Sequence, residues 1–140
     1  MAELRAWTPA VQSVLASADA CDRVSDLPGA CRVSPVEVAL VGEVSEAAVR
    51  AAVARLDPDA VVLDVSDGWV ALTLDGPGSR EAFARLSELE LPDAGAIAGE
   101  VAGVGVRVLA HGDRIDLLVP SMVGAHVRER IEVDCAELLP

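Results

Sequence analysis

Hydrophobic residues recur at nearly every second position between residues 60 and 74, and a tight-turn dipeptide interrupts them. That dipeptide, Asp67-Gly68, is the strongest kind of short-range signal for a two-residue hairpin turn when alternating apolar residues flank it. A turn at this point pairs residues whose numbers sum to 135, and it places the paired apolar residues on one side of a sheet. The pattern therefore predicts a hairpin with one buried face. The expected cross-strand pairs are Val65 with Val70, Leu63 with Leu72, and Val61 with Leu74.

A second hairpin is expected around Gly112-Asp113, where pairing residues whose numbers sum to 225 again brings apolar residues together. A turn at Ala102-Gly103 adds a third strand upstream, although Ala is a less typical turn residue than Asn or Asp. Its inward residues are Ile97, Gly99 and Val101, and the pairs of the second hairpin are Ala110 with Ile115, Val108 with Leu117, and Val106 with Val119.

Helical spacing of apolar residues predicts three further elements. One covers residues 44–56, a second opens at Gly78 or Ser79, and a third begins at Ser121, which acts as its cap. With a short strand at 36–41, the order becomes β-α-β-β-α-β-β-β-α. Hairpins with one apolar face and helices to cover it are typical of an α+β fold with a ferredoxin-like antiparallel sheet.

Residues 1–35 differ from the rest and are expected to form an N-terminal arm. Thr8-Pro9 is a favourable helix start, and Val11, Val14, Leu15 and Ala18 follow with helical spacing. The next fifteen residues are rich in Gly, Pro, Asp and Ser, which predicts a loop. The arm docks either on its own domain or on a partner. Residues 36–131 then form a single α+β domain, and residues 132–140 a tail.

The chain is strongly acidic, with 23 acidic residues against 11 arginines and a net charge of −12. Such a surface repels phosphate backbones and anionic lipid, so binding to nucleic acid or to membranes is not expected. No apolar run approaches the ~18 residues of a membrane span, and no signal peptide is expected, which indicates a cytoplasmic protein. The chain has three cysteines, Cys21, Cys31 and Cys135. They allow one disulfide, such as Cys21–Cys31, and the sequence does not decide whether it forms.

No catalytic, cofactor-binding or metal-binding motif is predicted. His111 and His126 are isolated in the sequence, and the glycines at 76–78 and 103–105 lack the context of a phosphate-binding or dinucleotide-binding loop. Asp64 is the one acid expected in mid-strand, on the same sheet face as Trp69. Together they line either a pocket or a contact with a partner, and a binding role is favoured over catalysis.

Several motifs occur in a recognisable order. Asp64-Val65-Ser66-Asp67 fits a D-[VL]-S-[DH] strand, and the run 72–77 fits L-x-[LV]-x-G-P. Further fits are residues 34–41 to G-P-D-E-W-L-L-V, residues 102–104 to x-A-G-V, and residues 118–121 to x-V-P-x-S. In this order they resemble the gamma subunit of heterotetrameric sarcosine oxidase and the related aminomethyltransferase (glycine cleavage T-protein) domains. The chain departs from the family pattern at Val38, where the family has Trp, and at Glu100, where it usually has Thr.

The resemblance implies a gamma-like accessory subunit that associates with a large alpha-type subunit and has no catalytic residues of its own. It implies that FAD, FMN, NAD and tetrahydrofolate are held by partner subunits. The assembly would demethylate an N-methyl amine and pass the one-carbon unit to tetrahydrofolate. For this role, Trp7 and Trp69 are the expected contributors to a contact surface.

An alternative is a stand-alone T-protein-like domain that binds a folate-like or other small ligand, with a homodimer as one possible form. That hypothesis predicts a closed pocket near Asp64, Trp69 and Arg80.

Overall fold

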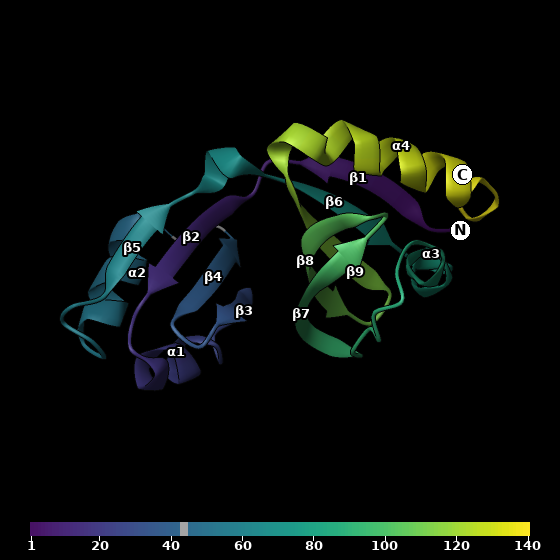
Figure 1. Ribbon diagram of the computed structural model, residues 1–140. Coiled ribbons are helices and arrows are strands. Elements are labelled where there is room, and N and C mark those ends of the chain that lie inside the picture. The colour runs from purple at the N-terminus through teal and green to yellow at the C-terminus, as the bar shows by residue number, and fades with distance from the viewer. Residues whose placement is uncertain (43–44) are drawn as a thin grey trace. The chain divides into compact units, whose positions relative to one another are not determined.

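The computed structural model describes residues 1–42 and 45–140, and Figure 1 labels their helices and strands. The chain divides into two compact units by its internal contacts. Unit 1 consists of Met1–Thr8 and Gly68–Pro140, and unit 2 of Pro9–Asp67. The N-terminal strand therefore belongs to the same unit as the C-terminal half. Within the described ranges, no helix combines the length and hydrophobicity needed to cross a bilayer.

Unit 2 is a four-stranded antiparallel sheet with two helices. Its elements are β2 (Ala10–Leu15), α1 (Ala18–Val24), β3 (Ala30–Ser34), β4 (Glu37–Gly42), α2 (Glu46–Ala54) and β5 (Val61–Asp64). The strand order is β3-β4-β2-β5, so each helix connects two strands that have a third strand between them. This β-α-β-β-α-β arrangement is the ferredoxin-like motif.

The core of unit 2 lies between its sheet and its helices. Val14, Val38 and Val62 occupy neighbouring positions on β2, β4 and β5, and all are nearly inaccessible to solvent. Cys21 and Val24 of α1 and Val49 and Val53 of α2 pack in the same apolar cluster. Both helices begin with a serine whose hydroxyl accepts a backbone N–H, Ser17 for α1 and Ser45 for α2, which satisfies a donor that the first turn would leave unpaired.

Unit 1 is a five-stranded antiparallel sheet in the order β1-β6-β9-β8-β7, with two helices. Its elements are β1 (Glu3–Trp7), β6 (Trp69–Asp75), α3 (Ser79–Leu86), β7 (Ala94–Val101), β8 (Val104–His111), β9 (Arg114–Pro120) and α4 (Gly124–Asp134), with short 3₁₀ turns at 66–68, 121–123 and 136–138. The described residues of the whole chain form four α-helices, and every strand pairing is antiparallel.

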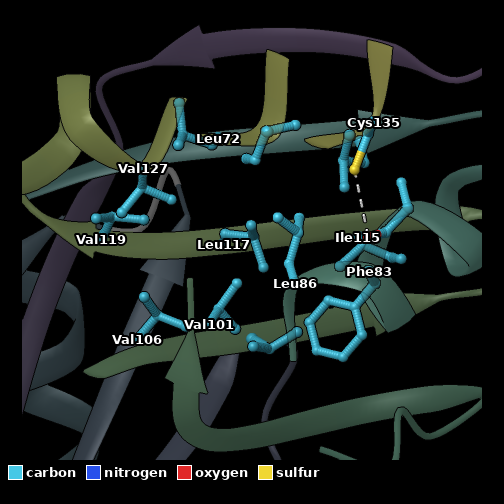
Figure 2. Packing of buried hydrophobic residues seen from close by; sticks show 14 residues of the cluster. Leu72, Phe83, Leu86, Val101, Val106, Ile115, Leu117, Val119, Val127 and Cys135 are labelled. Atoms are coloured by element: carbon cyan, nitrogen blue, oxygen red, sulfur yellow. Dashed lines mark hydrogen bonds between the residues drawn. The ribbon is translucent and has the colours of Figure 1, made fainter. Parts of the chain in front are cut away.

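Side chains from the sheet and from α3 and α4 converge in the core of unit 1, as Figure 2 shows. Phe83 and Leu86 come from α3, and Val127 comes from α4. Cys135, just after α4, donates from Sγ to the Ala82 carbonyl oxygen at 3.6 Å. The face that these residues cover, with Leu72, Leu74 and Leu117 among its members, is hereafter the core face of the unit 1 sheet.

Most elements expected after residue 35 are confirmed, and their order is the predicted β-α-β-β-α-β-β-β-α. The second hairpin has the predicted register, since Ala110 pairs with Ile115 and Val108 with Leu117. The Ala102-Gly103 turn is also correct, with Val101 opposite Val104. The α+β class with ferredoxin-like antiparallel sheets holds. The expected contribution of Val44 to the second helix lies outside the described residues.

The prediction of a helix after Thr8-Pro9 is wrong, because residues Ala10–Leu15 form strand β2. Val11 and Val14 fit helical spacing, but β2 is a central strand between β4 and β5, and both side chains are fully buried on opposite faces. Pairing on both sides outweighs local spacing there. The following segment was expected to be a loop, but it contains α1 and β3.

The hairpin at Asp67-Gly68 is also wrong. Residues 66–68 form a 3₁₀ turn, and the strands on either side of it belong to different units. β5 pairs with β2, and β6 pairs with β1 and β9. The apolar side of β6, with Val70, Leu72 and Leu74, is nevertheless the side that faces the core.

The expected domain boundaries therefore change. Residues 1–35 are not an arm, because they supply three of the nine described strands and one helix to the two units. The expected single domain at 36–131 is divided near residue 68. The C-terminal tail belongs to unit 1: the backbone N–H of Ala2 donates to the Leu138 carbonyl oxygen at 2.9 Å, and Arg85 pairs with Glu137.

The Cys21–Cys31 bridge is not formed, and none of the three cysteines is in a disulfide. Arg32 reaches α1, where its guanidinium lies 2.8 Å from Asp22. Successive side chains of a strand point to opposite faces, so Cys31 points away from the helix that carries Cys21. The two thiols lie on opposite sides of the unit 2 sheet.

Candidate interaction surface

The unit 1 sheet has a second face, opposite its core face, that carries both tryptophans. Trp7 on β1 pairs with Ala71 on β6, and Trp69 lies two residues before Ala71 on the same strand. Residues two apart on a strand share a face, so Trp7 and Trp69 are diagonal neighbours. We call this surface the tryptophan face. Its other members used below are Thr73, Arg107, Arg114 and Asp116.

A chain of hydrogen bonds crosses three strands of the tryptophan face. The indole Nε1 of Trp7 donates to Oγ1 of Thr73 at 2.8 Å, and the Thr73 hydroxyl donates to Oδ1 of Asp116 at 2.6 Å. Nε of Arg114 donates to the same Asp116 oxygen at 3.3 Å. Thr73 is fully buried and acts as acceptor and donor at once, so its hydroxyl is satisfied and fixes the orientation of the Trp7 ring.

Trp69 is held by a cation–π contact. The Arg107 guanidinium lies 4.4 Å from the centre of the Trp69 ring. Such a contact contributes about 0.5–1 kcal/mol at an accessible site. Both tryptophans are only partly buried, and each ring is oriented by a polar or charged neighbour. This arrangement of oriented, partly accessible aromatic rings is typical of protein contact surfaces.

Asp64 is not part of the tryptophan face, because it ends β5 in unit 2. It is exposed, and its Oδ1 accepts from the Ser66 hydroxyl at 2.6 Å and from the Ser66 backbone N–H at 2.9 Å. The hydroxyl and then the backbone bond from Ser66 hold the pKa of Asp64 below its ordinary value, with a smaller contribution from Gln12. Because the Ser66 hydroxyl also accepts from the Val11 backbone N–H at 2.8 Å, Asp64 orients a structural turn.

Arg80 is a structural residue near the start of α3. Its Nε donates to the Gly112 carbonyl oxygen at 2.9 Å, and its Nη2 donates to the carbonyl oxygens of Pro92 at 2.9 Å and Asp93 at 3.2 Å. The guanidinium thus ties the turn between β8 and β9 to the segment before β7. Its donors are used within unit 1.

Trp69 and Arg80 do not meet in a pocket. Trp69 begins β6, whereas Arg80 follows the end of that strand and binds the β8–β9 turn. A seven-residue strand separates its two ends by roughly 20 Å.

The sequence could not reveal the Thr73–Asp116 contact, because it depends on a β6–β9 register between segments about forty residues apart.

Across residues 1–42 and 45–140, no group of three or more His, Cys, Asp or Glu side chains is arranged to hold a metal ion. His111 and His126 are both exposed and lie on different elements, β8 and α4. Unit 2 has an apolar hollow of about 270 Å³ between α2, β4 and Leu27-Pro28, and none of the four candidate residues lines it.

No family model matches the sequence, and a search of curated proteins gives no match. Among solved structures, the chain is similar to one described as heterotetrameric sarcosine oxidase from Corynebacterium sp. U-96 in complex with pyrrole 2-carboxylate. The TM-score is 0.81 at 18% sequence identity, and the match covers 98% of this chain and 85% of that chain. It therefore spans both units. The chain has the fold of a polypeptide of a heterotetrameric sarcosine oxidase.

Proposed function

We propose that this chain is a non-catalytic, gamma-like accessory subunit of a sarcosine-oxidase-type flavoenzyme, and that it stabilises the large alpha-type subunit. The observation that carries the proposal is the structural likeness, which extends over 98% of the chain with a TM-score of 0.81. A likeness over both units fits a polypeptide that serves as a whole subunit better than it fits one shared ligand-binding module. The motif resemblance from residue 34 to residue 131 points in the same direction.

The internal use of polar side chains also supports a binding role. Thr73, Arg80 and Asp64 make hydrogen bonds that hold strands and turns in place. General acid–base or nucleophilic catalysis needs such groups to converge on a substrate. On this proposal, FAD, FMN, NAD and tetrahydrofolate are bound by partner subunits, and the assembly works in the cytoplasm on an N-methyl amine.

The tryptophan face is the proposed source of contact residues, through Trp7 and Trp69. Tryptophan is enriched among the residues that dominate binding energy, because a large ring buries much area at small entropic cost. The hydrogen bond from Trp7 and the cation–π contact at Trp69 orient both rings in advance. Ordering them before association lowers the cost of binding.

The experiment is co-expression with the large subunit of a sarcosine-oxidase-type enzyme from the same source. We expect the chain to raise the soluble yield of the large subunit and to lengthen its half-life during proteolysis. Phe83→Ala, which empties the core of unit 1, should abolish this protection, whereas Glu129→Ala on the exposed side of α4 should retain it. A large subunit that is equally stable without the chain would contradict the proposal.

One observation favours the alternative of a stand-alone domain that binds a folate-like ligand, namely the apolar hollow in unit 2. Both tryptophans belong to unit 1 and the hollow belongs to unit 2, so the readout is taken from residues of unit 2. Tetrahydrofolate titration followed by NMR of Leu40 and Val49, which line the hollow, is the direct readout. Specific shifts of these methyl groups, without any association with the large subunit, would favour the alternative.

A further inference from the structure

The two sheets end in four edge strands, and three of these are protected against further pairing. β5 has only four residues. β3 has an irregular register between Arg32 and Ser34. The Arg32 guanidinium donates hydrogen bonds to the carbonyl oxygens of Ser34 and Pro35, at 2.7 Å each. β1 is five residues long and carries Glu3 and Arg5. Short length, bulges and charges are the usual means by which natural sheets prevent edge-to-edge pairing.

The fourth edge strand, β7, is neither short nor irregular in register. It extends over eight residues, AGAIAGEV, has no proline, and carries a single charge at Glu100. Its register with β8 is regular from Ala94 to Val101. A long, regular and nearly uncharged edge is a template on which another extended segment can add a strand.

The hairpin turn fixes which backbone groups of β7 point outward. In a two-residue hairpin the closing pair, here Val101 and Val104, exchanges hydrogen bonds, and alternate pairs do so along the ladder. The N–H and C=O groups of Ala94, Ala96 and Ala98 therefore point away from β8. Glu100 has the same parity, and its carbonyl oxygen accepts from the Ser87 hydroxyl at 2.6 Å, as expected of an outward group. Within the described part of the chain, no such hydrogen bond occurs at the three alanines.

We propose that β7 adds a strand from the large partner subunit, so that its edge is the main-chain contact of the complex. This inference rests on the proposed function. A second copy of the chain is the less suitable occupant, because each copy carries a net charge of −12 and two copies repel one another. The small side chains of Ala96 and Ala98 leave room for large residues on the incoming strand, and Glu100 favours a basic residue near its end.

The test is residue-resolved hydrogen exchange of the chain alone and in complex with the co-expressed large subunit. We expect the amides of Ala96 and Ala98 to exchange rapidly in the chain alone and at least tenfold more slowly in the complex. The Ile97 amide, which bonds to β8, should be protected in both states. A complex in which the two alanine amides still exchange rapidly overturns the inference and leaves the accessory role intact. Failure to form any complex overturns both.

A matched pair of variants supplies an independent readout. Ala98→Pro removes an outward N–H that β8 does not need, and an edge strand tolerates proline there. Ala98→Ser changes the same side chain and keeps the donor. We expect Ala98→Pro to weaken association by about tenfold, the effect of about one lost hydrogen bond, and Ala98→Ser to leave it unchanged. Equal changes in affinity for Ala98→Pro and Ala98→Ser would overturn the inference. Slow exchange of the alanine amides in the chain alone, caused by self-association, would also overturn it.

Discussion

At the scale of single residues, Thr73 is the side chain on which the tryptophan face depends. Its hydroxyl accepts from Trp7 and donates to Asp116 while it is fully buried. Without this hydroxyl, the Trp7 indole N–H loses its acceptor and Oδ1 of Asp116 loses one of its donors. An unmade bond at a buried site costs more than the net gain of a made one.

We therefore expect Thr73→Val, which keeps the shape of the side chain, to lower the free energy of unfolding by about 1–3 kcal/mol. Thr73→Ser keeps the hydroxyl and should lose less. Urea denaturation followed by tryptophan fluorescence measures both, and an NMR shift of the Trp7 indole proton should accompany only the valine variant. Equal stability of the valine variant and the wild type would show that the hydrogen-bond chain is not formed in solution.

Asp64 offers a second prediction at this scale, through its pKa. The Ser66 hydroxyl is the largest cause of the lowered value, so Ser66→Ala should raise the pKa of Asp64 towards its ordinary 3.8. Because the folded-state pKa is the lower one, the stabilisation is fully present above the unfolded value and is lost as the pH falls through the folded value. An NMR titration of the Asp64 side chain measures the shift. An Asp64 titration curve that does not respond to Ser66→Ala would contradict this assignment.

At the scale of elements, Arg80 connects the start of α3 to two loops that are distant in sequence. Arg80→Ala leaves the carbonyl oxygens of Pro92 and Gly112 without their donors. We expect a loss of about 2 kcal/mol in the free energy of unfolding and faster hydrogen exchange in the β8–β9 turn. Arg80→Lys replaces the planar guanidinium by a single ammonium group, so its free energy of unfolding should lie between those of the wild type and Arg80→Ala. An alanine variant as stable as the wild type would contradict this role.

The β7–β8 turn gives another prediction at this scale. Ala102 and Gly103 both have positive φ, at 53° and 78°, and no atom crowds the position that a Cβ on Gly103 would take. Gly103→Ala should therefore cost about 1 kcal/mol for purely conformational reasons. Ala102→Gly, which relieves the same strain at the neighbouring residue, should cost nothing. Thermal unfolding of the two variants measures the difference, and equal melting temperatures would contradict a left-handed turn.

These two hairpins also show how far the sequence determines the elements. The registers of β7 with β8 and of β8 with β9 were predictable, because each is fixed by a turn between adjacent segments and by the match of apolar residues. The hairpin predicted at Asp67-Gly68 was wrong because the two strands beside it pair with other strands: β5 pairs with β2, and β6 pairs with β1. Those competing strands lie about fifty to seventy residues away, where local pattern carries no information.

At the scale of the whole molecule, the same limit applies to the candidate surface. Trp7 and Trp69 were both expected at a contact surface, but their common face depends on the pairing of β1 with β6 across the full length of unit 2. Thr73 and Asp116 become recognisable only once that pairing and the β6–β9 register are known. The ferredoxin-like class was predictable because it depends on the order and polarity of elements, and unit 2 realises it within 59 residues.

The accessory role is a claim about the molecule as a whole, and the mass of its complex tests it most directly. Size-exclusion chromatography with light scattering should be run on the chain, on the large subunit of the sarcosine-oxidase type, and on their mixture. We predict that the mixture elutes as one species containing one copy of this 14.5 kDa chain per large subunit. A chain that remains a monomer or a homodimer in the mixture, with the mass of the large subunit unchanged, would contradict the account.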